Sequence, residues 1–196
     1  MEPARELPVL TDEEKARWQA LRSDIREMAP RIRRAEATEE EIQAAFGRLA
    51  ALDIDNYTLM NALHIPADAG EAYSAGLERI LRRIPDGWGR WISHERGWYR
   101  LIIERDRRLS KVDPNYVVFR VREKFGTLGY YCAPSIEETY EVRKQFQDAI
   151  FMARHASTTT CERCGRNGVL YQRNDWVKRL CEICGDDLGF TRCQRA

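Results

Sequence analysis

The chain has 196 residues, 43% of them hydrophobic and 32% charged, which suffices for one domain or two small ones with an apolar core. Its formal net charge of +1 excludes a strongly polybasic nucleic-acid binder and an acidic mimic. The N-terminal sequence has no basic segment followed by an apolar run, and no stretch approaches the ~20 apolar residues that span a bilayer. We therefore expect a cytoplasmic protein with no membrane partner.

Residues 1–86 are predicted to form a helical domain. Apolar residues recur at helical spacing, and two of the expected helices begin with a capping box. The capping boxes pair Thr11 with Glu14 and Thr38 with Glu41. Pro30 is expected to kink or end the first helix. The four helices are expected over about 11–32, 38–52, 56–63 and 70–83, and their short connections favour a compact bundle.

Residues 87–158 follow a break rich in proline and glycine and are predicted to form an α-β-β-α unit. Its first helix is expected over 93–109. His94 and Glu95 are adjacent at its start, so they do not face each other as an acid–base pair would. We interpret both as solvated surface residues.

A two-stranded hairpin is expected in the middle of this unit, over 116–122 and 128–132. Apolar side chains alternate along the first strand, which predicts one buried face. The residues of that face are Val117, Phe119 and Val121. Ser135 and Glu138 form a third capping box, and the helix that follows is expected to reach about His155.

Two C-x-x-C pairs mark the last part of the chain, residues 159–196. They consist of Cys161, Cys164, Cys181 and Cys184. This spacing predicts one Zn²⁺ held tetrahedrally by four thiolates, a closed and structural site. In a reducing compartment, such pairs serve as metal ligands rather than disulfides. A hairpin is expected between the pairs; a helix after the second would make a treble clef, and an extended chain a zinc ribbon.

No catalytic constellation is recognisable. His64, His94 and His155 are far apart, and the chain has no phosphate-binding loop, H-E-x-x-H or G-x-S-x-G motif. Cys132 is expected to be a buried strand cysteine, and Cys193 lies in a basic tail beyond the four expected ligands. We therefore expect a protein that is not an enzyme and has no small-molecule substrate.

Two further groups of residues are candidates for contacts. An aromatic cluster at the expected break favours a joint between the helical domain and the α/β unit, with a base-stacking platform as the alternative. It consists of Trp88, Trp91, Trp98 and Tyr99. Basic residues in the second half suit either a solvated surface or a face that contacts nucleic acid or a partner. They are Arg120, Arg122, Lys124, Arg163, Arg166, Arg173, Lys178 and Arg179.

Three motifs follow one another between about residues 88 and 187. They are Gly97-Trp-Tyr-Arg-Leu-Ile102, then Val121-Arg-Glu-Lys-Phe-Gly-Thr-Leu128 with Tyr130 and Tyr131, and the two cysteine pairs. This part resembles a family of uncharacterised bacterial and phage proteins with a GWxxLI helix, a KEKFGxLRxY hairpin and a zinc knuckle. Here Arg122 stands for the first Lys, and Gly129 replaces the Arg. The resemblance implies a fold and no activity.

Taken together, these patterns predict an α+β protein with an N-terminal helical bundle, a small α-β-hairpin-α unit and a zinc ribbon or treble clef. We expect a non-enzymatic binding protein whose partner is another protein. By analogy with the phage and mobile-element proteins that this part resembles, the expected setting is interference with a host or defence protein. The alternative is a nucleic-acid-binding regulator that uses residues 87–196, which carry 20 Lys/Arg and 14 Asp/Glu.

Overall fold

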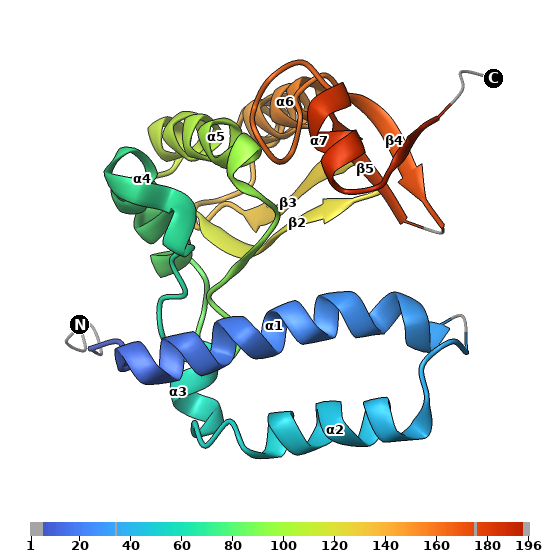
Figure 1. Cartoon of the computed structure of the whole chain (residues 1–196). Coiled ribbons are helices and arrows are strands. Elements are labelled where there is room, and N and C mark those ends of the chain that lie inside the picture. The colour runs from blue at the N-terminus through green and yellow to red at the C-terminus, as the bar shows by residue number, and fades with distance from the viewer. Residues whose placement is uncertain (1–5, 34, 175, 194–196) are drawn as a thin grey trace. The chain divides into compact units, whose positions relative to one another are not determined.

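The computed structural model describes residues 6–33, 35–174 and 176–193 and shows a mixed α+β protein (Figure 1). The chain divides into two compact units, Met1–Ala62 and Leu63–Ala196. The division therefore lies at residue 62 and not at residue 86, where the sequence pattern placed it. The reason is that α4 (Gly70–Arg82) buries Leu77, Ile80 and Leu81 in the core of the second unit.

The first unit is helical. It consists of α1 (Asp12–Arg33), α2 (Glu39–Ala50) and α3 (Asn56–Asn61). Both expected capping boxes are confirmed. The Thr11 and Thr38 hydroxyls accept from the backbone N–H three residues on, and the Glu14 and Glu41 carboxylates accept from the backbone N–H of Thr11 and Thr38. The first helix continues through Pro30, which therefore does not end it.

The helices of the first unit bury few apolar side chains. The buried hydrophobic residues among those described are Leu10, Leu21, Leu52 and Ala62. Ion pairs connect α1 and α2, with Arg31 2.7 Å from Glu41 and Arg48 2.6 Å from Asp24. No helix in the described part of the chain is long and apolar enough to cross a bilayer.

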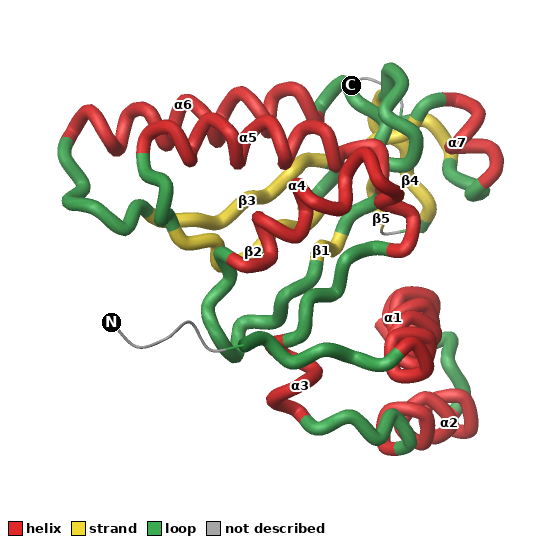
Figure 2. The backbone as a smooth tube through the Cα atoms, turned by 90° about the vertical axis from the view of Figure 1, so that its left-hand side faces the viewer, coloured by secondary structure: helices red, strands yellow, loops and turns green. Residues whose placement is uncertain are grey.

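The second unit is built on a three-stranded sheet in the order β1-β2-β3. Strand β1 (Ile92–Ser93) runs parallel to β2 (Val117–Lys124), which forms an antiparallel hairpin with β3 (Thr127–Ala133). Helices α5 (Tyr99–Val112) and α6 (Tyr140–Ser157) lie side by side on one face of this hairpin (Figures 1 and 2). Short 3₁₀ helices, Ala67–Ala69 and Arg96–Trp98, precede α4 and α5.

A buried carboxylate ties the core elements of this unit together. Asp106 on α5 is fully buried and accepts from Arg79 at 2.6 Å, Arg83 at 2.8 Å and the Tyr116 hydroxyl at 2.8 Å. Burial raises the pKa of Tyr116, and the negative charges of its neighbours add to the shift, so its hydroxyl remains a donor. Charge-assisted bonds of this kind hold α4 and the start of the sheet against α5.

The buried face expected along β2 is confirmed at Val121 and wrong at Val117 and Phe119, because the strand contains a bulge. The register with β3 shifts between Val118 and Arg120. Val118 and Val121 are buried, whereas Val117 and Phe119 are only half-buried. A bulge inserts one residue and exchanges the two faces, and simple period-two counting cannot detect it.

Two helix starts in this unit also differ from expectation. The region expected as a helix from 93 begins with β1 and a 3₁₀ turn, and α5 starts only at Tyr99. The Ser135 capping box does not form, and Thr139 caps α6 instead by accepting from the Val142 N–H. Ser135 instead donates to the buried Asp113 carboxylate, a long-range bond that competes with the local cap.

The four cysteines belong to a compact module at the C-terminal end of the second unit. It contains a second sheet in the order β5-β4-β6 and one short helix, α7. Their bounds are β4 Val169–Arg173, β5 Trp176–Leu180, α7 Glu182–Asp187 and β6 Thr191–Arg192. We refer to residues 159–193 as the metal module.

Candidate metal centre

Two short loops deliver the four thiols. The first, Cys161–Gly165, lies between the end of α6 and β4, and the second pair starts and lines α7. In the first loop the Gly165 N–H donates to the Cys161 carbonyl at 2.9 Å, and Gly165 has φ +80°. A residue with a Cβ is strained at this φ, which accounts for glycine directly after the first pair.

The positions of the four sulfur atoms fit one tetrahedral ion. All four ligand atoms of Cys161, Cys164, Cys181 and Cys184 lie within 4.8 Å of one another, and the Cys164 and Cys181 sulfurs are 3.6 Å apart. A tetrahedral Zn²⁺ with Zn–S bonds of about 2.3 Å separates its sulfur ligands by about 3.8 Å. The predicted ligand set is therefore brought together, and its donor type suits zinc.

The environment of the thiols is uneven. Burial raises the pKa of Cys161, against backbone hydrogen bonds that lower it. Burial also raises the pKa of Cys184, and hydrogen bonds with the neighbouring sulfurs add to that shift. Burial acts in the same direction on Cys164, but hydrogen bonds from Arg166 outweigh it and bring the pKa of this thiol to about 6. Arg166 thus supplies positive charge at the most exposed of the four sulfurs.

The first loop is seated directly on the core of the second unit through Gly97. The Gly97 N–H donates to the Glu162 carbonyl at 2.7 Å. A Cβ built on Gly97 would lie 2.5 Å from that carbonyl oxygen and as close to the Gly165 nitrogen. Only a residue without a side chain permits this approach, so Gly97 fixes the metal module against the 3₁₀ turn before α5.

Further hydrogen bonds continue this seating. The Trp98 indole donates to the Thr160 carbonyl at 2.8 Å, and the Arg179 Nε donates to the Gly126 carbonyl at 3.4 Å. Trp98 is fully buried. The metal module and the core therefore share buried polar contacts.

A buried ionic cluster lies at the same junction. Lys178 on β5 is buried and pairs with Glu95, and its Nζ lies 3.5 Å from the carboxylate of Glu162. Burial raises the pKa of Glu162 to about 7, against the opposing effect of Lys178. The expectation that Lys178 contacts a partner is therefore wrong: the core covers it, and its charge is used inside the molecule.

His94 is also buried here, so its interpretation as a solvated residue is wrong. Its ring packs against Trp98 and Tyr99, and Nδ1 lies 3.1 Å from the Glu95 carbonyl, to which it can donate. Nε2 is buried and has no hydrogen-bond partner among the described residues. Burial lowers the pKa of His94 to about 4, so the ring is neutral at pH 7.

The other seven basic candidates are divided between β2 and the metal module. Arg120 and Lys124 are exposed on β2. In the metal module, Arg163 forms an ion pair with Asp187 at 3.2 Å. The seven residues are Arg120, Arg122, Lys124, Arg163, Arg166, Arg173 and Arg179.

The four aromatic candidates have different surroundings. Trp98 and Tyr99 are buried in the core of the second unit, and the Tyr99 hydroxyl donates to Asp68 at 2.8 Å. Trp88 is 56% exposed, with its ring centroid 5.0 Å from that of Phe119. The Trp91 ring contacts His64 edge-on, with the centroids 5.8 Å apart.

The two remaining cysteines stand outside the group of four thiols. Burial raises the pKa of Cys132 to about 11, which makes this half-buried strand cysteine unreactive at neutral pH. The Cys193 N–H donates to the Leu170 carbonyl at 3.0 Å, which anchors the end of β6.

Sequence reasoning missed Gly97, His94 and Lys178 as residues of the junction. The Gly-Trp dipeptide enters the sequence analysis only as part of a motif, and no local pattern marks its glycine as a point of close backbone approach. Nothing near Lys178 in the sequence distinguishes it from the half-buried Arg179. Its glutamate partner on the core is 83 residues away.

Comparisons of the chain with protein-family models, curated proteins and solved structures return no match.

Proposed function

We propose that this chain is a zinc-stabilised binding protein that acts by docking another protein and has no catalytic activity of its own. The second unit supplies a rigid body held by one structural Zn²⁺. The first unit supplies the docking surface, which consists of apolar side chains on α1 and α2. The cytoplasm, where thiols stay reduced, is the compartment that suits this design.

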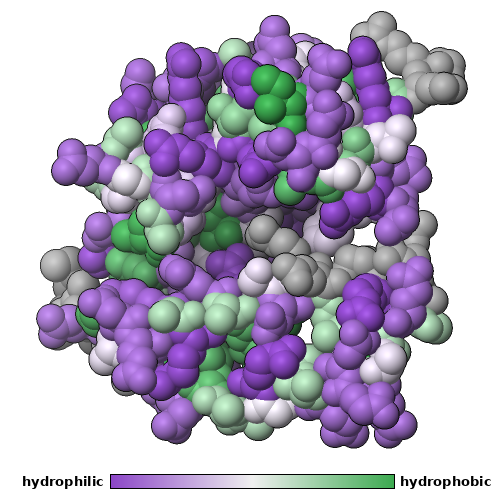
Figure 3. Space-filling view, in the orientation of Figure 1, coloured by the Kyte–Doolittle hydropathy of each residue, from purple (hydrophilic) through white to green (hydrophobic). Residues whose placement is uncertain are grey.

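The observation that carries the proposal is that apolar side chains on α1 and α2 are exposed. Phe46 is 65% exposed and Leu49 47% exposed, and α2 has no buried residue. On α1, Ile25 and Ile32 are also about half exposed. Figure 3 shows green, hydrophobic residues at the surface over α1 and α2. Several large apolar side chains exposed on two neighbouring helices are typical of a helical protein-interaction site.

The proposed zinc is structural, and the proposed plan of the module is a treble clef. A loop with the first cysteine pair, a β4–β5 hairpin and a helix that begins directly after Cys181 follow one another. A zinc ribbon would leave the chain extended there. Four thiolate ligands leave no position on the ion for water or substrate, which supports a non-enzymatic role.

Nucleic-acid binding is the weaker candidate. Lys178 is buried, and Arg163 forms an ion pair with Asp187. Exposed Arg120 and Lys124 could still add a weak, salt-sensitive attraction to phosphates. The resemblance to phage proteins suggests that the docked protein is a host or defence factor, and it adds nothing in favour of nucleic acid.

A pull-down from an extract of the native host tests the proposal, with and without nuclease. The bait is the full zinc-loaded chain, compared with Phe46→Asp/Leu49→Asp. Phe151→Asp is the matched control, because Phe151 is 67% exposed on α6 in the other unit. We expect the bait to capture a partner protein whose recovery does not change with nuclease. Phe151→Asp should still capture it, and the double variant should not.

Two results would contradict the proposal. Recovery that disappears with nuclease would assign the binding to nucleic acid. Equal recovery by the double variant and by Phe151→Asp would move the docking surface away from α1 and α2.

A further inference from the structure

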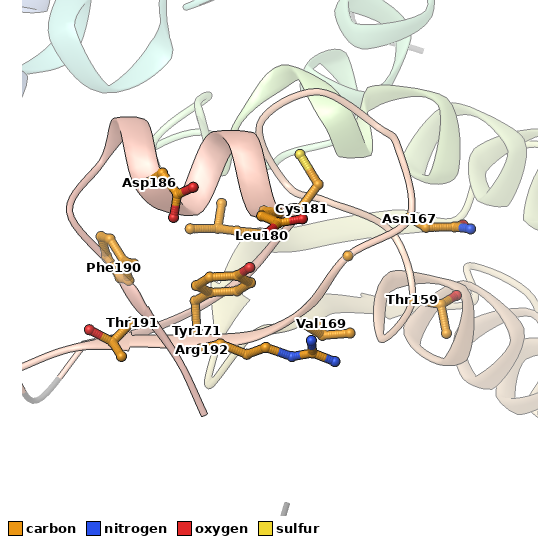
Figure 4. A pocket seen from close by; sticks show the side chains of 12 residues that line it. Thr159, Asn167, Val169, Tyr171, Leu180, Cys181, Asp186, Phe190, Thr191 and Arg192 are labelled. Carbon is orange, nitrogen blue, oxygen red and sulfur yellow. The ribbon is translucent and has the colours of Figure 1, made fainter. Parts of the chain in front are cut away.

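A groove of about 760 Å³ opens on the metal module beside α7 and the β4–β6 pair (Figure 4). This volume lies within the range of small-ligand sites. Its lining combines the buried rings of Tyr171 and Phe190 with the charged side chains of Glu182, Asp186 and Arg192. The groove is distinct from the proposed docking surface, because it lies on the other unit.

Tyr171 is held rigidly in this groove. It is only 5% exposed, and a Cβ on Gly185 would lie 2.5 Å from its ring. The ring therefore packs on the backbone of α7, and no rotation is needed to place its hydroxyl. Tyr171 lines the groove, and its hydroxyl forms no side-chain hydrogen bond with any residue that the structure describes. A hydroxyl that is held in place by packing and not used in a bond within the protein is a preorganised contact for a ligand.

The carboxylates of Glu182 and Asp186 are four residues apart on α7, which places them on one face of the helix. Both are exposed, and neither forms an ion pair with any residue that the structure describes, whereas the adjacent Asp187 pairs with Arg163. Figure 4 shows the Asp186 carboxylate directed toward Tyr171, with Arg192 reaching toward Val169 on the opposite side. The α7 wall of the groove thus carries two carboxylates that form no ion pair with a described residue, and the lining also contains one cation, Arg192.

We propose that this groove binds a cationic group, an ammonium or a guanidinium, between Glu182 and Asp186, with the Tyr171 hydroxyl accepting one of its hydrogen bonds. Two carboxylates and a hydroxyl supply several acceptors, and a guanidinium carries five donors in a fixed fork. The concave wall concentrates the negative potential and raises the local concentration of cations. The cation comes from a basic side chain of a peptide or from a free amine, and the two sources share this chemistry.

Chemical-shift titration of the ¹⁵N-labelled, zinc-loaded full chain with agmatine tests the site. We expect saturable shifts confined to β4, α7 and β6, with a Kd of about 1 mM, as suits a small ligand with few atoms. A second arm uses acetyl-Gly-Arg-Gly-amide. Tighter binding of this peptide than of agmatine identifies a peptide side chain as the source, and the reverse order identifies a free amine.

Matched variants distinguish binding in the groove from a general attraction of the cation to the negative charge of α7. Asp186→Asn should weaken agmatine binding about tenfold, because it removes a charge-assisted hydrogen bond. Tyr171→Phe should weaken it by a smaller factor. Asp187→Asn removes the same charge from the same helix but not from the groove, and it should leave the affinity unchanged. Zinc content of each variant, measured in the same sample, shows that the module is folded.

The proposal is overturned if the shifts do not saturate, or if Asp186→Asn and Asp187→Asn weaken binding equally. It is also overturned if inorganic phosphate shifts the Arg192 region while agmatine shifts nothing, since the groove would then be an anion site. None of these results bears on the docking surface of α1 and α2, which the Phe46 variant tests separately.

Discussion

The two units of the chain bury their apolar residues to very different degrees. In Leu63–Ala196 one cluster surrounds the fully buried Trp98, and a second surrounds the cysteines. In Met1–Ala62 the described buried hydrophobic residues are few, and α2 has none. The helices of the first unit are nonetheless well defined at their starts, because Thr11 and Thr38 form complete capping boxes.

This difference teaches that local signals suffice to start a helix but not to stabilise a domain. Most helical stability in proteins comes from the packing of an amphipathic face. The second unit has that packing, together with four thiols close enough to hold a metal ion and buried polar bonds. The first unit leaves much of its apolar face open, and a partner that covers it would supply what the unit lacks.

Removal of the metal should produce the largest effect, and it should act on the second unit only. Structural zinc contributes about 10 kcal/mol or more to the folding of such modules, so chelation under reducing conditions should unfold residues 159–193. Thermal unfolding followed by tryptophan fluorescence should shift strongly, because Trp98 loses its bond to Thr160. An unchanged transition after complete chelation would show that the metal does not stabilise this unit.

Truncation at two positions should sharpen the boundary between the units. A fragment of residues 63–196 should be soluble and unfold cooperatively. A fragment of residues 87–196 should aggregate, because it lacks Leu77, Ile80, Leu81 and Ile84, each of which contributes about 1.5–3 kcal/mol by burial. Equal stability of the two fragments in urea would place α4 outside the core.

Two glycine-to-alanine changes, one in each unit, should change the free energy of unfolding in opposite directions. Gly97→Ala forces a Cβ against the backbone of the cysteine loop and should destabilise the protein by about 3 kcal/mol. Gly47→Ala meets no atom within 4 Å in the exposed helix α2 and should stabilise that helix by about 1 kcal/mol. Urea unfolding measures both, and a neutral Gly97→Ala would contradict the close seating of the metal module.

A smaller effect should appear in the pH dependence of the second unit. The pKa of buried His94 is about 4, below its ordinary 6.5, because burial disfavours the cation and the nearby Lys178 adds to this, while Glu95 and Asp68 oppose it. The associated stability is present above pH 6.5 and is lost as the pH falls toward 4, because only the unfolded chain takes up the proton.

Between pH 7 and pH 5, the free energy of unfolding should fall by about 2 kcal/mol less in His94→Gln than in the wild-type chain. His155→Gln is the matched control, since His155 is exposed on α6. The two variants can be compared by urea unfolding at each pH. Identical pH profiles would show that His94 is not buried in the neutral form.

Features encoded locally were predictable from the sequence. The capping boxes at Thr11 and Thr38, the β2–β3 hairpin and the four thiols each follow from residues close together in the chain or from a fixed spacing. Such patterns specify the backbone over a few residues, so no knowledge of the tertiary structure is needed.

Features that depend on distant partners were not predictable. Ser135 has the local pattern of a cap, but its bond to Asp113 prevails. The bulge after Val118 exchanges the two faces of β2, so Val118 is buried in place of Val117 and Phe119. Gly97 and Lys178 acquire their roles only when the metal module packs on the core. In each case the deciding contact joins residues that no periodicity connects.

Native mass spectrometry of the freshly reduced full chain tests the central claim most directly, that one zinc held by Cys161, Cys164, Cys181 and Cys184 organises the second unit. We predict a mass increase of one zinc ion per chain, lost in Cys161→Ser and retained in Cys193→Ser, whose thiol lies outside the group. A metal-free wild-type chain, or zinc retained at full occupancy by Cys161→Ser, would contradict the account.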